Sequence, residues 1–227
     1  MVIADELLLL AVDDSTGKKL ASGTNLDAAL AAALLVELAL SERISIAPAE
    51  AGWRDKGKIT VINTAPTDDP DLDAVLGVLA AKDGQKVKNL ISPMTGKAIS
   101  KGLRDRRLAA LVQRGVLTEQ RSAVWGIRSH PTRDPAPEQE VRNRLWSALV
   151  DRTTPSERTV ALVALLEAAG LITKVLAVED KKALKARART LSEGDWAAKA
   201  VKDAVAEMTA VMVAVSAGSG GGDGGGS

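Results

Sequence analysis

The stretch from position 24 to 40, TNLDAALAAALLVELAL, decides the fold class of this chain. Leucines recur in it at a spacing of four, and alanines and further leucines between them make almost the whole helix surface apolar. A helix that is apolar on all sides has to be enclosed by other elements. The stretch therefore predicts a helix at the centre of a bundle, and its stripe consists of Leu26, Leu30, Leu34 and Leu38.

The composition of the whole chain agrees with a helical fold. Of the 227 residues 46% are apolar but only 2% are aromatic, with no Phe or Tyr. Ala, Leu and Val supply the bulk, and Ala favours the helix more than any other residue. We expect one helical domain over residues 1–217, followed by a disordered Gly/Ser tail over 218–227.

The rest of the chain predicts two β-hairpins, and amphipathic helices that surround the central helix. Alternating apolar residues at 43–47 and 58–62 predict a hairpin with a long loop through Trp53. A second hairpin is expected to pair 116–118 with 123–127 around a polar tip, Glu119 to Ser122. The fold class is thus mainly α, a central hydrophobic helix bundle ringed by amphipathic helices, with further helices expected at 70–81, 99–114, 138–151, 155–169, 181–191 and 196–215.

Most catalytic and metal-binding residue sets are missing from this sequence. There is no Cys and only one His, so thiolate chemistry and histidine metal clusters are excluded, and we expect no enzyme activity, metal or cofactor. His130 is predicted to make a structural hydrogen bond at a turn. The acidic pairs at 68–69 and 71–73 suit a helix N-terminus better than an acid–base pair.

The charge balance and the apolar runs of the chain indicate its binding partners and its cellular localisation. The chain has 30 Lys plus Arg against 29 Asp plus Glu, so no global field attracts DNA, and anions have to be bound by a local patch. The N-terminus lacks a basic segment and a cleavage site, and no apolar run reaches the roughly 20 residues needed to cross a bilayer. We expect a cytoplasmic protein without a transmembrane segment.

Arg104 is the candidate binding residue. On a helical wheel Arg104 falls between Leu103 and Leu108, inside the apolar stripe. Such a guanidinium either reaches water along its stem, pairs with a carboxylate of the core, or binds an anion such as phosphate. The three alternatives stay open at this point, and two further cations precede Arg104 on the same side of the wheel, Lys97 and Lys101.

The order of motifs from Glu6 to Ile172 resembles the Golgi phosphoprotein 3 family. The motifs that carry the resemblance are LLLLAVDD, ALLVELALSERISI, INTAPTDDPDLDAVL, LAALVQRGVLTEQ, SHP and RTVALVALLEAAGLI. The resemblance implies a helical domain that binds membranes peripherally and recognises phosphatidylinositol 4-phosphate. The Ala-rich and Arg-rich, Cys-free composition is typical of a bacterial relative.

The resemblance also implies a head-group pocket built from one Trp and three Arg, next to a hairpin that inserts apolar side chains. Arg104 and Lys101 match two of the basic positions, whereas Ser22 and Ala31 stand at the positions of the Trp and of the third Arg. The candidate lipid phosphate-binding residues are therefore Arg104, Lys101 and Lys97, and the hairpin residues expected to contact the membrane are Val124 and Trp125.

A winged-helix DNA-binding regulator is the alternative function. The basic segment KGLRDRRLAALVQRG is followed directly by a hairpin, as a recognition helix is by a wing. A net charge of +1 speaks against it, because DNA binding draws most of its affinity from many phosphate contacts. We therefore favour an anionic phospholipid head group as the partner over nucleic acid.

Overall fold

The computed structural model describes residues 1–12, 23–81, 84–91, 99, 101–121, 128–194 and 199–218, and of 23–25, 121, 199–200 and 215–218 only the backbone. The described helices are α1 (Ile3–Leu10), α2 (Gly23–Leu40), α3 (Pro70–Ala81), α4 (Val87–Ile91), α6 (Leu103–Gln113), α7 (Ala136–Leu149), α8 (Glu157–Ala168), α9 (Ile172–Val175), α10 (Lys181–Glu193) and α11 (Lys199–Gly218). The short elements are the 3-10 turn η1 (Ala49–Ala51) and the strands β1 (Ile44–Ile46), β2 (Ile59–Val61), β3 (Gln120–Arg121) and β4 (Arg128–Ser129). The mainly helical fold class is confirmed.

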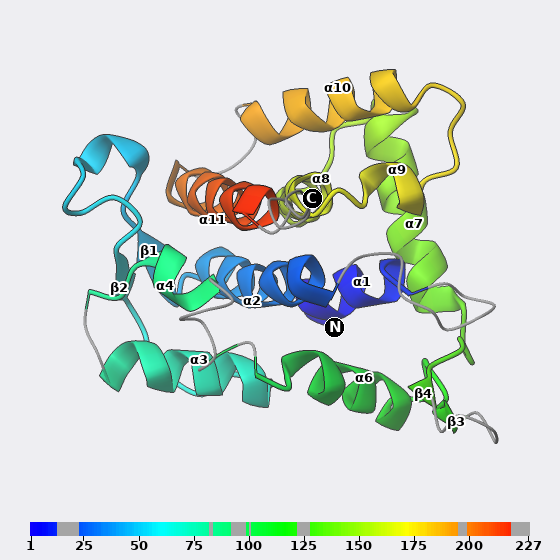
Figure 1. The fold of residues 1–227 in the computed structure, drawn as a ribbon, viewed down its shortest axis with the longest axis horizontal. Coiled ribbons are helices and arrows are strands. Elements are labelled where there is room, and N and C mark those ends of the chain that lie inside the picture. Colours follow the sequence, from blue (N-terminus) through cyan, green and yellow to red (C-terminus); the bar gives the residue numbers. More distant parts are fainter. Residues whose placement is uncertain are drawn as a thin grey trace, which may run out of the picture.

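Helix α2 lies at the centre of the bundle, as its sequence predicts. Every leucine of its stripe is at most 1% exposed. In Figure 1, α1 and α2 run through the middle of the molecule, with α3 and α6 on one side, α8 and α11 on the other, and α7 across one end. Helix α2 contacts α1, α3, α4, α6, α8 and α11.

Helix α1 is the second central element, and the sequence did not identify it as a helix. All eight of its residues are buried, including the two carboxylates Asp5 and Glu6. Burying a charge is costly unless it is paired. Cationic partners for these two acids therefore have to come from the surrounding helices. The resulting ion pairs are described below with the candidate site.

The first hairpin is confirmed, whereas the prediction for the second was wrong in position. Ile44 pairs with Val61 and Ile46 with Ile59, as the alternation predicts. In the second hairpin Gln120 pairs with Ser129 and Arg121 with Arg128, so the connection is 122–127 and not 119–122. The reason is that Val116 and Leu117 are buried against the core, which leaves the pairing to polar residues without an alternating pattern. Residues 122–127 themselves lie outside the described residues.

The helix boundaries agree with the sequence except before Arg104. Helix α6 begins at Leu103 and not at Ile99, because Gly102 adopts φ +66°, a left-handed conformation that interrupts a helix. Helix α11 buries Val201, Val205 and Met208 where it packs against α2 and α8, as its spacing predicts. The short helices α4 and α9 have no counterpart in the sequence analysis. Of the tail, Gly218 ends α11 and 219–227 lie outside the described residues.

Candidate anion-binding site

Helix α6 presents Arg104 at the edge of its buried face. Leu103, Leu108 and Leu111 of this helix are at most 6% exposed, and α6 packs on α1 and α2. The side chain of Arg104 lies beside this face and retains 21% of its exposure. Arg104 is therefore partly desolvated and still reachable from solvent.

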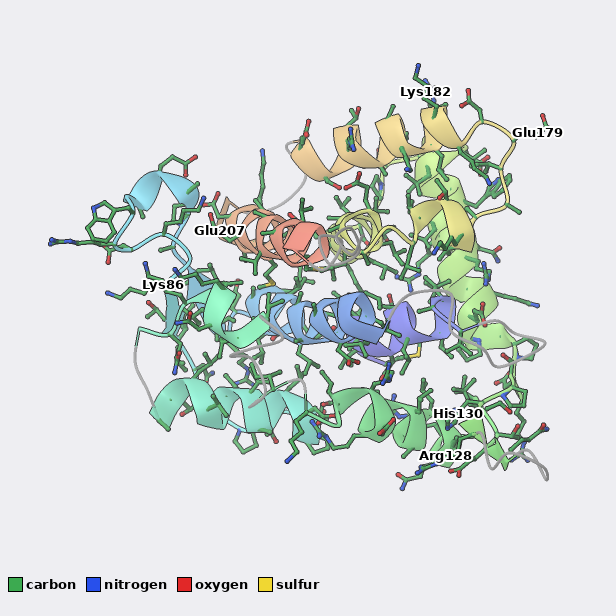
Figure 2. The ribbon with its side chains drawn as sticks, in the orientation of Figure 1. Lys86, Arg128, His130, Glu179, Lys182 and Glu207 are labelled. Atoms are coloured by element: carbon green, nitrogen blue, oxygen red, sulfur yellow. The ribbon has the colours of Figure 1, made fainter. Side chains whose placement is uncertain are left out.

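A cavity of about 270 Å³, which we call the Arg104 cavity, opens beside this guanidinium. Figure 2 labels two of its residues, Arg128 and His130, at the lower right of the molecule, where the second hairpin meets the end of α6. Its apolar wall comes from α1, α2 and α6, and its polar wall from α6 and the hairpin. The polar residues are Arg104, Asp105, Glu119, Arg128 and His130, and the apolar ones Leu8, Val12, Leu26, Leu108 and Ala109.

The guanidinium of Arg104 has unused hydrogen-bonding capacity. Its nearest acidic partner is Asp27, with 3.6 Å between Nη1 and Oδ1, which is longer than a hydrogen bond. Its Nε and Nη1 atoms are buried, and neither has a hydrogen-bond partner among the described residues. A buried donor without an acceptor costs about 1–3 kcal/mol. These two atoms therefore retain hydrogen-bonding capacity in a residue that lines the cavity.

Arg107, three residues further along α6, is surrounded by carboxylates. It is 1% exposed, and its Nη1 and Nη2 atoms both donate to the carboxylate of Asp69, the first at 2.6 Å. Its Nη2 lies 2.8 Å from Asp71 Oδ2, and its Nη1 lies 3.4 Å from Asp5 Oδ1. Burial disfavours the charge of Arg107, but the hydrogen bond to Asp69 and the nearby carboxylates outweigh it and raise its pKa. We call Arg107, Asp5, Asp69 and Asp71 the Arg107 cluster.

Asp69 also caps helix α3. Its Oδ1 accepts the backbone N–H groups of Asp71 and Leu72 at 3.0 and 3.1 Å, which confirms that this acidic run begins a helix. Burial raises the pKa of Asp69, but Arg107 and the two backbone donors lower it more, so that it lies below its usual value. The caps and the ion pairs thus join α3 to α6 through one carboxylate.

A second set of ion pairs ties α1 to the other side of the bundle. Arg158 Nε donates to Glu6 Oε1 at 3.0 Å, and its Nη1 donates to Glu37 Oε1 at 2.8 Å. Arg144 Nη2 lies 3.1 Å from the same oxygen of Glu6. The charge of Glu6 is therefore compensated by α7 and α8, while Asp5, next to it in sequence, is compensated from α6 by Arg107 and by Arg114, whose Nη1 donates at 2.8 Å.

The structure separates the residues that the sequence grouped together. Arg104 lies in the cavity, but Lys101 precedes α6 in an exposed turn, where its carbonyl accepts a hydrogen bond from Arg106 Nη1 at 2.8 Å. The helix that carries Arg104 therefore does not extend back to Lys101, because Gly102 between them adopts φ +66°. Ala31 is buried in α2 and offers no cation. Lys97, Val124, Trp125 and Ser22 lie outside the described residues.

Sequence reasoning missed Arg107 as the buried arginine. The spacing of four between Leu103, Arg107 and Leu111 places Arg107 at the centre of the apolar stripe, and Arg104 only at its edge. That signal was available in the sequence. The hairpin cation Arg128 was also missed, and no local pattern connects Arg128 to Arg104.

The structure argues against the winged-helix alternative. A recognition helix needs exposed side chains that reach bases and phosphates. On α6, Arg107 is buried in its cluster, and Arg106 Nε donates to Asp71 Oδ1 at 2.6 Å. Two of the cations that made this helix look like a recognition helix are therefore bound to carboxylates of the fold.

Two kinds of feature are absent from the described part of the chain. None of its helices combines the length and the apolar character needed to cross a membrane. Within the same residues, no group of His, Cys, Asp and Glu side chains could hold a metal ion.

Comparison with known proteins finds a family and a curated relative to which this chain is similar. The family model described as Golgi phosphoprotein 3 (GPP34) matches residues 3–208. Vacuolar protein sorting-associated protein 74 of Eremothecium gossypii is 24% identical over 207 residues, which cover 79% of this chain and 62% of the relative. The chain thus spans less than two thirds of the length of that curated relative.

Proposed function

The chain belongs to the Golgi phosphoprotein 3 family, and on that premise we propose that it is a peripheral membrane protein that binds the phosphate of an anionic lipid head group in the Arg104 cavity. The observation that carries the proposal is the buried Nε and Nη1 of Arg104, which lack hydrogen-bond partners among the described residues. A phosphate accepts two parallel hydrogen bonds from one guanidinium. Arg104 belongs to α6 and lines the cavity, which supports this contact.

The remaining polar wall suits a phosphorylated head group that carries hydroxyls. Arg128 adds a second cation from β4, while Asp105 and Glu119 offer carboxylate oxygens that accept hydrogen bonds from hydroxyl groups. A simple phosphate would gain nothing from those acids. We therefore propose phosphatidylinositol 4-phosphate, the lipid that the family resemblance implies, ahead of lipids without a hydroxylated ring.

The membrane-facing residues belong to the same proposal. Lys101 is exposed at the start of α6, where it would meet the lipid surface together with Lys97. The register of β3 and β4 leaves 122–127 as the end of the hairpin, and this sequence, SAVWGI, is apolar. Val124 and Trp125 are then the side chains proposed to enter the interface, where Trp is enriched. The protein would act from the cytoplasm, as an adaptor and not as an enzyme.

Co-sedimentation with vesicles tests the proposal. Phosphatidylcholine vesicles that contain phosphatidylinositol 4-phosphate are compared with vesicles brought to the same charge by phosphatidylserine, and with duplex DNA. We expect tighter binding to the phosphoinositide vesicles and a loss of that preference in Arg104→Ala. Arg189→Ala is the matched control, because Arg189 is an exposed arginine of α10 that does not line the cavity. Equal binding of Arg104→Ala and Arg189→Ala would refute the proposal.

A further inference from the structure

A second and larger cavity lies between α4 and α11, away from the Arg104 cavity. Its volume is about 670 Å³, within the range of about 300–1,000 Å³ that ligand pockets occupy. In Figure 2 two of its residues, Lys86 and Glu207, lie at the left of the molecule, whereas Arg128 and His130 of the Arg104 cavity lie at the lower right. We call it the α4–α11 cavity. The proposed lipid site does not use it.

The segment between β1 and β2 is fixed to the start of α4 by a hydrogen bond and approaches α11 closely at Gly57. Gly57 adopts φ +69°, and a Cβ atom there would lie 3.2 Å from Glu207 Oε2, so only glycine lets the loop approach this carboxylate without strain. The backbone N–H of Gly57 donates to the carbonyl of Ala47, and the N–H of Val87 donates to the carbonyl of Gly57, both at 2.9 Å. The cavity is therefore formed before any ligand arrives, which lowers the entropic cost of binding.

The charged residues on this cavity leave an excess of positive charge. Lys56, Lys86 and Lys88 line it with a single carboxylate, Glu207, which is 6% exposed. Lys56 Nζ lies 3.4 Å from Glu207 Oε1 and compensates it. Lys86 Nζ donates to the carbonyl of Trp53 at 3.1 Å, a neutral acceptor that leaves its charge in place. The cavity thus favours a ligand with more than one negative charge.

The α4–α11 cavity also has an apolar lining and an exposed indole. Val87, Val211, Ala210 and Ala214 contribute the apolar lining from the two helices. Trp53 is 81% exposed, and the guanidinium carbon of Arg54 stands 5.2 Å from the centre of its ring. Trp and Arg are the residue types enriched in the hot spots of protein–protein interfaces. This combination indicates a protein partner.

We propose that the α4–α11 cavity binds an acidic segment of a partner protein. A bulky apolar side chain of the segment enters between Val87 and Val211 and packs against Trp53, and its carboxylates pair with Lys86 and Lys88. A bilayer surface is too flat to fill a concave site of this kind, whereas a peptide segment reaches both the apolar lining and the lysines. The inference goes beyond the proposed lipid binding and does not depend on it.

Selection of short random peptides displayed on phage, with the full chain immobilised, tests this inference. We expect the enriched peptides to be acidic and to carry a large apolar residue. Calorimetry with the synthesised peptides should show binding weakened by about tenfold or more in Trp53→Ala and in Lys88→Glu. Lys181→Glu, the same charge reversal on exposed α10, and Arg104→Ala should leave the affinity unchanged, which keeps this result separate from that of the lipid site.

Three outcomes would overturn the inference. One is that no peptide is enriched, or that the enriched peptides are basic. Another is that selected peptides bind Trp53→Ala and Lys88→Glu as tightly as the unchanged chain, with melting temperatures confirming that both variants are folded. The third is that Lys88→Glu loses affinity for anionic vesicles but not for the peptides, which would assign this surface to lipid.

Discussion

Arg104 and Arg107 lie three residues apart on α6, and their surroundings differ in what the fold supplies. Arg107 is 1% exposed, and three carboxylates surround it. They come from Asp5 of α1, Asp71 of α3 and Asp69, the residue just before α3. Arg104 has one carboxylate at 3.6 Å and a cavity of about 270 Å³ beside it. Each retains a buried Nε without a partner among the described residues, but for Arg104 this also holds for Nη1.

This difference teaches how a structural arginine can be told from a ligand-binding one on the same helix. Where the protein itself provides the counter-charges, as it does for Arg107, loss of the side chain leaves carboxylates uncompensated in the core. Where the protein supplies only one partly exposed carboxylate at 3.6 Å and a cavity lies beside the guanidinium, as for Arg104, loss of the side chain should affect ligand affinity and leave the fold intact. The following predictions test that contrast.

Arg107→Ala should have the largest effect. Removing one partner of a buried ion cluster costs about 3–5 kcal/mol, and here three carboxylates, those of Asp5, Asp69 and Asp71, would lose their shared cation. We expect the free energy of unfolding, measured by urea denaturation, to fall by that amount. A loss under about 1 kcal/mol would mean that the Arg107 cluster does not stabilise the fold.

Acid should remove part of what Arg107→Ala removes. The pKa of Asp69 lies below its usual value, so its contribution to stability is complete above about pH 4 and is lost as the pH falls through the lowered pKa. The raised pKa of Arg107 gives no titration near neutrality. Urea denaturation in a pH series should thus show a steeper acid loss in the unchanged chain than in Asp69→Asn, and parallel curves would contradict the prediction.

Arg104→Ala should change binding and not stability. Loss of charge-assisted hydrogen bonds to a phosphate costs about 1.5–3 kcal/mol, which is roughly a 10- to 150-fold weaker affinity for phosphoinositide vesicles. The free energy of unfolding should stay within about 1 kcal/mol, because no carboxylate is left uncompensated in the core. If stability falls and affinity per folded molecule does not, Arg104 is structural and the contrast with Arg107 fails.

Lys101→Ala should have the smallest effect. A single basic residue near an anionic surface contributes about 1 kcal/mol, or roughly fivefold in affinity, and salt screens it. We expect the loss in vesicle binding to vanish at high salt, whereas the loss in Arg104→Ala should persist. A salt-resistant loss in Lys101→Ala would place this lysine inside the head-group site.

The sequence predicted the parts of the fold that local patterns determine. The leucine stripe of α2, the alternation of β1 and β2 and the acidic start of α3 all correspond to elements of the structure. The second hairpin was misplaced because Gln120–Arg121 and Arg128–Ser129 pair without an apolar pattern. Helix α1 was missed because its four consecutive leucines, 7–10, show no helical period.

Of the residues that line the Arg104 cavity, the sequence predicted only Arg104 as a binding residue. The wheel directed attention to Arg104, and the structure places it in a cavity. The distinction between Arg104 and Arg107 depends on Asp5 and Asp69, which are 102 and 38 residues away from Arg107 in sequence. No spacing rule within one helix reveals partners at such separations.

The burial of α1 has a consequence for folding. Helix α1 precedes its ionic partners along the chain, since Asp5 pairs with Arg114 at a separation of 109 residues and Glu6 with Arg158 at 152. Until the segments that carry those arginines are in place, the two acids of α1 lack their cations. Contacts of such long range form slowly. We therefore expect α1 to be fixed in the core only after α6 and α8 have formed.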